Sequence, residues 1–285
     1  MQRTTPLIVV LGLLPGLGLI LLAMGSVAYM AVAQSFGYFN FSGESGFSTG
    51  YWTEELSSPQ LWRAFFYSLK IALWGSICSV LLAYPLALWL RRPFPGSLFI
   101  SAVLKAPYLV HGLVAAFLFV NVISFHGFFN EFMLWVGIID RPLRMQNDSY
   151  GWGVIYLQIW KNIPFALIVL SGAVQGISDD VLFAAQDLGA GAFDRFRKVV
   201  APLTLNAMQA ALVIVFIGAA GDFSFQVIAG PTSEASMAQY MVRLKETGGQ
   251  WNAAAVVAVM LMVLALFGSL ILAVITRMVV KKAQS

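Results

Sequence analysis

Residues 183–203 read Phe-Ala-Ala-Gln-Asp-Leu-Gly-Ala-Gly-Ala-Phe-Asp-Arg-Phe-Arg-Lys-Val-Val-Ala-Pro-Leu, a polar stretch between two long apolar segments. The pattern predicts a short helix over 181–188, a break at Gly189-Ala190-Gly191 and a second short helix over 192–200, which Pro202 ends. Small residues at such a bend allow another protein to approach closely, and a rigid elbow can transmit motion. The alternative is an ordinary loop between two helices, in which glycine and charge are also expected.

The composition surrounding this stretch is that of a membrane protein. The chain has 285 residues, of which 59% are hydrophobic and 11% are charged, whereas soluble domains carry roughly 25% charged residues. A helix needs about 20 apolar residues to cross a bilayer. We therefore predict an all-α polytopic membrane protein, with residues 1–285 forming a single transmembrane domain. The six expected spans are approximately 6–32, 64–90, 98–125, 151–177, 203–225 and 250–277.

The distribution of basic residues predicts the orientation of these spans. With six spans, both ends of the chain and the second and fourth loops lie on one side. That side carries nine basic residues: Arg3, Arg91, Arg92, Arg195, Arg197, Lys198, Arg277, Lys281 and Lys282. The other side carries four: Arg141, Arg144, Arg243 and Lys245. The positive-inside rule places the nine-residue side, with both termini and the loop at 179–202, in the cytoplasm.

The spacing of Ala184-Ala185, Gly189 and Pro202 resembles the EAA loop of type I ABC-importer permeases. Two positions differ from that pattern, since Phe183 stands where an acidic residue is expected and Ala201 where a leucine is expected. The resemblance implies that this loop is a cytoplasmic coupling helix, through which the permease receives force from an ATPase. The residues it assigns to this coupling are Ala184, Ala185, Asp187, Gly189, Arg195 and Pro202.

The resemblance extends over roughly residues 60–280 and is greatest to the spermidine/putrescine-type branch. It rests on residues 130–140 (Asn-Glu-Phe-Met-Leu-Trp-Val-Gly-Ile-Ile-Asp), on Asp187-Leu188-Gly189-Ala190 and on Gly221-Asp222-Phe223. It implies the type I permease fold in the cytoplasmic (inner) membrane. It also implies three partners: a dimer of nucleotide-binding ATPase subunits, a second homologous permease subunit and an extracytoplasmic solute-binding protein. ATP-Mg would bind the ATPase partners, so no cofactor is expected in this chain.

One acidic residue, Asp222, lies in or next to an apolar run. Charged residues within a membrane usually face the interior of the bundle or water, because lipid solvates them poorly. Asp222 therefore becomes a candidate for the substrate pathway, together with the neighbouring aromatic residues Phe223 and Phe225. The alternative is a structural acid that pairs with Lys161 or caps the fifth span.

Pro164 is expected to break the fourth span, because proline lacks an amide donor and clashes with the preceding turn. Transporter sites are often built at broken helices. Four residues near the expected break are accordingly pathway candidates: Gln158, Trp160, Lys161 and Asn162. The alternative is a kink that packs against another helix.

The third span and the segment after it carry weaker signals. Asn121 is a further pathway candidate, and His111 lies ten residues before it. Ten residues correspond to about 1000° of helical rotation, so the two share a face only loosely. Between residues 125 and 140, apolar residues recur at helical spacing, which predicts a short helix lying in the outer interface of the membrane.

Several classes of function are disfavoured because the sequence lacks the motifs that they require. It has no P-loop and no H-E-x-x-H motif, and we assign it no catalytic residue, no metal ligand and no enzymatic activity. Its basic residues form no patch that would bind nucleic acid. The single cysteine, Cys78, permits no disulfide within the chain.

We therefore expect a permease subunit of an ATP-driven importer that moves a small polar solute, either polyamine-like or a related organic solute. A stand-alone secondary transporter is the alternative, and an intramembrane enzyme is a third hypothesis. The solute's charge stays open at this point. Asp222 is opposed by Lys70, Lys105 and Lys161 in the membrane region, a balance that does not favour a polycation. An amino acid derivative, an opine and a phosphonate-like anion remain alternatives.

Overall fold

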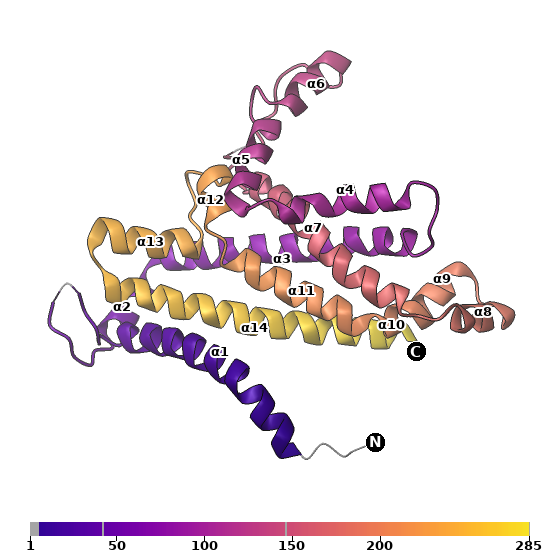
Figure 1. Ribbon diagram of the computed structural model, residues 1–285. Coiled ribbons are helices and arrows are strands. Elements are labelled where there is room, and N and C mark those ends of the chain that lie inside the picture. Colours follow the sequence, from indigo (N-terminus) through magenta and orange to yellow (C-terminus); the bar gives the residue numbers. More distant parts are fainter. Residues whose placement is uncertain (1–5, 42, 146, 285) are drawn as a thin grey trace. The chain divides into compact units, whose positions relative to one another are not determined.

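The computed structural model describes residues 6–41, 43–145 and 147–284, and the described chain is built of helices (Figure 1). Their bounds are α1 Pro6–Ser35, α2 Gly50–Ser57, α3 Pro59–Trp89, α4 Ser97–Leu109, α5 Gly112–Ile123, α6 Phe128–Val136, α7 Trp152–Gln175, α8 Asp179–Asp187, α9 Ala192–Arg195, the π-helix η1 Phe196–Val200, α10 Ala201–Leu203, α11 Leu205–Ala220, α12 Ser224–Ala229, α13 Met237–Gly248 and α14 Trp251–Gln284. The chain divides into two compact units: unit 1 contains residues 1–61 and 240–260, and unit 2 contains residues 62–239 and 261–285.

Unit 1 is held together by polar contacts around the end of α1. The Asn252 amide at the start of α14 donates to Gln34 O at 2.6 Å, and the Trp52 indole donates to Ser35 Oγ at 3.3 Å. Gly37 has φ +93°, and a Cβ there would lie 2.3 Å from Gly46 O. The turn after α1 therefore requires glycine at this position.

Glu55 on α2 is a buried carboxyl group in unit 1. The Tyr240 hydroxyl donates to its Oε2 at 2.9 Å. Burial raises the pKa of Glu55 above its ordinary value of 4.5; the bond from Tyr240 partly opposes this rise, and nearby Glu54 adds to it.

This raised pKa predicts a pH dependence of the stability of unit 1. A carboxyl group whose pKa is higher in the folded than in the unfolded state contributes stability that is complete below pH 4.5 and is lost as the pH rises through the folded pKa. Glu55→Gln should therefore flatten the change in melting temperature above pH 4.5, whereas Glu54→Gln, at an exposed neighbour, should change it little. Tryptophan fluorescence melts at pH 4.5 to 7.5 would measure this, and an equal pH slope in wild type and Glu55→Gln would contradict it.

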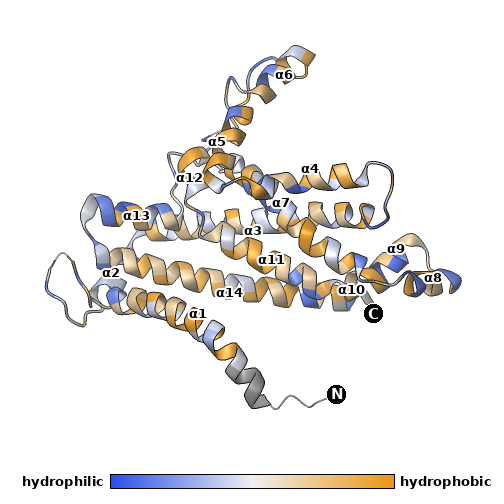
Figure 2. Cartoon of the chain, in the orientation of Figure 1, coloured by the Kyte–Doolittle hydropathy of each residue, from blue (hydrophilic) through white to orange (hydrophobic). Residues whose placement is uncertain are grey.

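Unit 2 contains two clusters of buried apolar side chains, and α3 and α7 contribute to both of them. Figure 2 shows the hydropathy of the residues along these helices. The first cluster joins the second half of α3 to α7 and α11, with Ala83, Leu167 and Ala211 fully buried. The second joins the first half of α3 to α5, α7 and α12, with Ile71 and Leu157 fully buried. Helix α3 thus contributes to the core along most of its length.

In the described residues, five stretches are long and apolar enough to cross a membrane. A sixth is counted if Ala192–Leu203 and Leu205–Ala220, which meet at a bend of 67°, form one span. Four of the expected spans correspond to α1, α3, α7 and α14. The expected third span, 98–125, is divided into α4 and α5, with Val110 extended between them (φ −81°, ψ 129°). The expected fifth span corresponds to α11, with α12 following it.

The break expected in the fourth span at Pro164 is absent, because α7 continues unbroken from Trp152 to Gln175. Pro164 is buried, and α7 packs against both α4 and α11. One proline removes only one intrahelical hydrogen bond, and packing by neighbouring helices supports the helix across that position. The break instead follows Pro107, in the last turn of α4.

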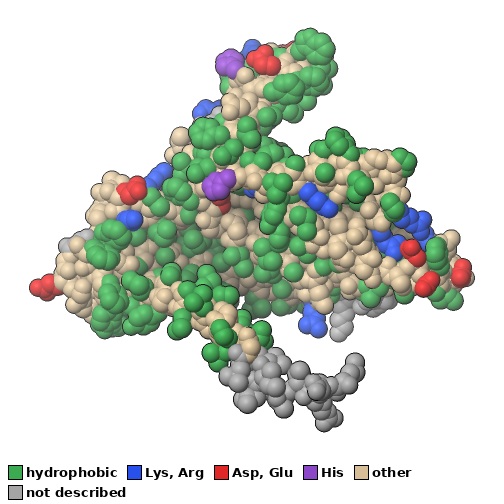
Figure 3. All heavy atoms as spheres, viewed as in Figure 1, with side chains coloured by type: hydrophobic (Ala, Val, Ile, Leu, Met, Phe, Trp, Pro, Cys, Tyr) green, Lys and Arg blue, Asp and Glu red, His purple; other side chains and the backbone are tan. Residues whose placement is uncertain are grey.

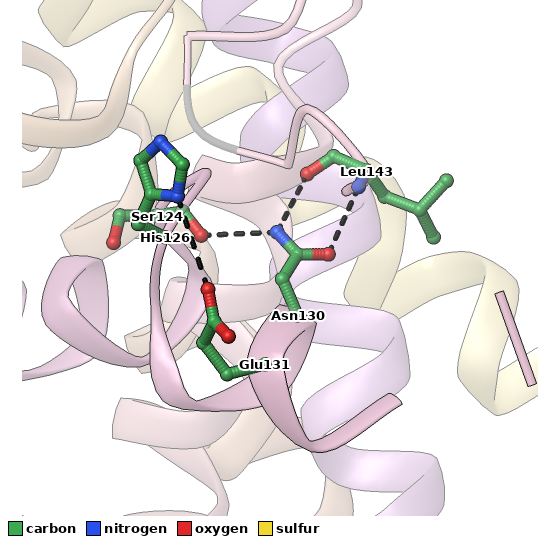
Figure 4. Close-up of polar contacts among 5 residues, drawn as sticks. All are labelled: Ser124, His126, Asn130, Glu131 and Leu143. Atoms are coloured by element: carbon green, nitrogen blue, oxygen red, sulfur yellow. Dashed lines mark hydrogen bonds and ion pairs between the residues drawn. The ribbon is translucent and has the colours of Figure 1, made fainter. Parts of the chain in front are cut away.

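The short helix predicted between residues 125 and 140 is α6, which lies within the apolar stretch Gly112–Val136. A buried asparagine joins it to the loop that follows (Figure 4). The Asn130 amide nitrogen donates to Ser124 O at 3.0 Å and to Leu143 O at 2.9 Å, while its oxygen accepts from Leu143 N at 2.9 Å. Beside it, His126 Nδ1 lies 3.8 Å from Glu131 Oε1. These contacts orient the apolar face of α6, where Trp135 is 82% exposed.

Candidate functional site: the bent loop and the α5–α7–α12 region

The loop at 179–202 has the bent form that its sequence predicts. Helix α8 is followed by Gly189 at φ +83°, where the Gly189 amide donates to Gln186 O at 2.8 Å and the Ala190 amide donates to Ala185 O at 3.0 Å. A left-handed glycine with these two bonds is a common end to a helix. The second expected helix is formed by α9, η1 and α10, and Pro202 lies in α10 rather than ending the helical run.

The outer surface of this loop is apolar as well as charged. Leu188 is 89% exposed and Phe193 is 72% exposed, and Val181 and Phe183 are exposed beside them. Acidic and basic side chains gather at the same end of unit 2 (Figure 3). The Arg195 guanidinium donates to Gln186 Oε1 at 2.5 Å and so joins α9 to α8. Exposed apolar groups with a charged surround are typical of a protein-binding surface.

Asp222 lies between α11 and α12, at the opposite end of α11 from α10 (Figure 1). Its Oδ2 accepts the Phe225 amide at 3.0 Å, so the side chain caps the start of α12. The structure therefore supports a cap, although on α12 rather than on the fifth span. Among the described residues, no ion pair joins Asp222 to Lys161.

The other pathway candidates divide into exposed and buried groups. Phe223 is exposed, whereas Phe225 is buried in the cluster of α3, α5, α7 and α12. Asn121 lies exposed on α5 and donates to Phe117 O at 2.9 Å. The Trp160 ring packs against Phe119 of α5, with 5.8 Å between the centroids. The structure thus brings α5, α7 and α12 together around these residues.

Gln158 and Asn162 form a hydrogen-bonded polar pair, about one helical turn apart, on α7. The Asn162 amide donates to Gln158 Oε1 at 2.9 Å and to Gln158 O at 2.8 Å. Gln158 is only 2% exposed, and its Nε2 has no hydrogen-bond partner within the described chain. A buried amide group in an apolar bundle is costly unless it is hydrogen-bonded. A hydrogen-bond acceptor placed next to this nitrogen would therefore be stabilising.

Lys161 occupies the break between α4 and α5. Its Nζ donates to Pro107 O at 2.6 Å, to Tyr108 O at 3.3 Å and to Val110 O. These carbonyls belong to the end of α4, where the helix dipole favours a positive charge. Lys161 therefore stabilises the broken helix from the neighbouring one, and His111 follows at the N-cap of α5.

Two arrangements were not predicted from the sequence. The Tyr67 hydroxyl on α3 donates to Gln226 Oε1 on α12 at 2.9 Å, and both residues are buried. Arg91 binds Asp179 at the start of α8, with 2.9 Å between Nη2 and Oδ1. For the Tyr67–Gln226 hydrogen bond, the available sequence signal was a polar residue, Gln226, within an apolar run. For the Arg91–Asp179 ion pair, the only sequence signal was the position of Arg91 at the end of a span.

The sequence profile of the family described as binding-protein-dependent transport system inner membrane component matches residues 2–284. The chain belongs to this family. It is a type I ABC-importer permease, a multi-pass protein of the inner membrane. Members of the family are transport components rather than enzymes.

Among curated relatives, this permease is 28% identical over 169 residues to the spermidine/putrescine transport system permease protein PotB of Escherichia coli, which covers 59% of this chain and 61% of the relative. It is 27% identical over 203 residues to the sulfate transport system permease protein CysT of Salmonella typhimurium, covering 69% of this chain and 70% of the relative. The matched part thus spans about 61% of the length of the first relative.

Solved structures show the same fold as this permease. A bacterial ABC transporter that imports the acidic polysaccharide alginate matches with a TM-score of 0.74 and 20% identity, covering 94% of each chain. The alginate transporter in complex with a periplasmic protein carrying an alginate pentasaccharide matches with a TM-score of 0.72 and 21% identity, covering 96% of this chain and 95% of that one. At these identities the likeness establishes the arrangement of helices alone.

Proposed function

We propose that this permease is a subunit of an ATP-driven importer and moves a small polar solute, either polyamine-like or a related organic solute, across the membrane after delivery by a binding protein. The family match over residues 2–284 is the observation that carries this proposal. The bent loop with its exposed Leu188 and Phe193 supports it, because an importer permease needs a surface on which an ATPase docks.

The partners follow from the same proposal. Two ATPase subunits bind loops of the type seen at 179–202 and hold ATP-Mg, so this chain needs no cofactor of its own. A second permease chain completes the pathway, and a binding protein delivers the solute on the side of α12. Mild solubilisation and affinity purification of the tagged permease should recover an ATPase subunit. Purification of the permease without any ATPase would contradict the proposal and favour a secondary transporter.

The loop, both termini and the turn between α3 and α4 would lie in the cytoplasm. The excess of basic residues on this side supports that orientation. Reporter fusions at residues 1 and 285 should both report a cytoplasmic location. A periplasmic signal from either fusion would contradict it.

The polyamine-like substrate is supported by the likeness to PotB and by Asp222, an acidic side chain placed beside exposed Phe223. The likeness to CysT, a sulfate transporter by name, provides the contrasting substrate for a test. Proteoliposomes containing the complete complex would be assayed with radiolabelled spermidine, putrescine and sulfate. Uptake of the amines alone is expected, and uptake of sulfate alone would contradict the proposed substrate class.

Asp222 should affect transport more than folding when only its charge is removed. In Asp222→Asn the side-chain oxygen can still accept the Phe225 amide, so the cap of α12 is retained. We expect amine uptake to fall by about tenfold, equivalent to 1.4 kcal/mol, at unchanged membrane abundance. Asp222→Ala should additionally lower stability by about 1 kcal/mol, because it removes the cap. Unchanged uptake in Asp222→Asn would remove Asp222 from the pathway.

A further inference from the structure

A single arginine connects the end of α3 to the start of the loop at 179–202, which is called the coupling loop here because an ATPase is proposed to move it. Arg91 follows α3 by two residues, and its amide donates to Leu88 O at 3.3 Å, so its backbone continues the last helical turn. Its Nη2 lies 2.9 Å from Asp179 Oδ1 and donates to Ile177 O at 2.7 Å. Its Nε donates to Val174 O at 3.2 Å.

This arrangement differs from an ordinary surface ion pair. Exposed pairs contribute about 0–1 kcal/mol, partly because two long side chains must be ordered. Here the Arg91 side chain is only 13% exposed and already donates to two carbonyls, that of Val174 in the last turn of α7 and that of Ile177 just after the helix. A planar guanidinium fixed in this way presents its remaining donors to a carboxylate with little further loss of entropy. Asp179 is therefore bound to a rigid partner.

The other end of the loop also contacts α3. The Tyr84 hydroxyl forms a hydrogen bond with Thr204 Oγ1, and the Tyr84 ring meets the Phe196 ring edge-on, with 5.5 Å between the centroids. Tyr84 and Arg91 are seven residues apart, which is close to two helical turns and places them on one side of α3. The loop is thus attached to one helix at both of its ends.

We propose that Arg91 is the positioning residue that transmits movement of the coupling loop to α3, through its ion pair with Asp179. The inference rests on the proposed function, in which an ATPase moves this loop. Helix α3 can carry such a movement to the far end of unit 2, because Tyr67 near its other end is bonded to Gln226 of α12. A displacement at α8 would then alter the region around Asp222.

The test compares Asp179→Ala with Asp180→Ala. Both acidic residues lie in the first turn of α8, so the two changes affect the helix dipole alike. Only the first removes the ion pair, and it leaves the bonds from Arg91 to Val174 and Ile177 in place. Each variant would be purified with its ATPase subunits and reconstituted with the binding protein. We expect the amount of labelled spermidine moved per ATP hydrolysed to fall by about fivefold or more in Asp179→Ala alone, the lower range of typical coupling between sites.

A second measurement separates transmission from a purely structural role. Spin labels would be attached at Trp89→Cys and at Ala192→Cys of the loop, both of which are exposed positions outside the proposed docking residues Leu188 and Phe193, with Cys78 replaced by serine. In the assembled complex, pulsed EPR should show one unchanged distance before and after trapping with ATP and vanadate, because the loop and α3 move together. In Asp179→Ala the distance should change on trapping, and Asp179→Glu should restore the original behaviour.

Identical behaviour of Asp179→Ala and Asp180→Ala in both measurements would overturn the inference. If Asp179→Ala lowers the abundance of the complex, Asp179→Asn, which keeps the size of the side chain, would take its place. It would be compared with Asp180→Ala in the same two measurements. Failure of the unaltered permease to recover any ATPase would contradict the proposed function instead, and it would be seen before any variant is compared.

Discussion

Gly189→Val is expected to lower transport per assembled complex by about tenfold. Gly189 has φ +83°, a conformation that β-branched residues strongly disfavour. The left-handed conformation costs roughly 1–2 kcal/mol for an ordinary residue, and about 1.4 kcal/mol corresponds to a factor of ten. The elbow between α8 and α9 would therefore lose its bend, while the rest of the chain would remain folded.

The controls for this prediction use the same loop. A Cβ at Gly189 or at Gly191 would meet no atom within 4 Å, so neither position is crowded within this chain. Gly191 has an ordinary φ of −65°, and Gly191→Val should therefore be tolerated. Gly189→Asn should retain most activity, because asparagine adopts the left-handed conformation more readily.

Gly189→Trp adds bulk on the side where the ATPase is proposed to dock and should uncouple ATP hydrolysis from uptake. Binding-protein-stimulated ATP hydrolysis and spermidine uptake would be measured on the same proteoliposomes. Together they give the amount of spermidine moved per ATP hydrolysed. Unchanged uptake in Gly189→Trp would mean that the bend has no part in coupling.

Lys161→Met is expected to destabilise the permease by about 1–2 kcal/mol, because carbonyls at the end of α4 lose their donor. A fully buried unpaired acceptor costs about 1–3 kcal/mol, and these bonds are partly buried or exposed. The affected carbonyls are those of Pro107, Tyr108 and Val110. Within a bilayer, no water replaces a lost donor unless the site opens to a cavity. Membrane abundance and the melting temperature in detergent would both fall.

Lys105→Met is the matched control, since Lys105 lies on α4 and forms none of these bonds. The double variant Lys161→Met with Asp222→Asn distinguishes the two roles considered for Lys161. If Lys161 paired with Asp222, the second change would restore stability, because it would neutralise the charge left unpaired. The structure predicts no restoration. Equal abundance of Lys161→Met and Lys105→Met would contradict the assigned role.

The elements whose conformation depends only on residues close to them in the sequence were predictable from the sequence. Long apolar runs indicated α1, α3, α7 and α14, because a helix satisfies its own backbone within each run. The bend at Gly189 was also predictable, since a left-handed helix end is a local preference of glycine. The short helix α6 followed from its apolar periodicity. These features need no knowledge of what lies beside them.

Two prolines illustrate what only the tertiary structure decided. Pro107 and Pro164 both lie in apolar runs, and each removes one backbone donor. Helix α7 continues through Pro164 because neighbouring helices pack around it, whereas the chain opens after Pro107 because Lys161, 54 residues further along, supplies donors to the freed carbonyls. The roles of Arg91 and Gln226 were likewise set by partners distant in sequence. Whether a helix bends or breaks thus depends on which groups satisfy its backbone, and in this permease those groups come from other helices.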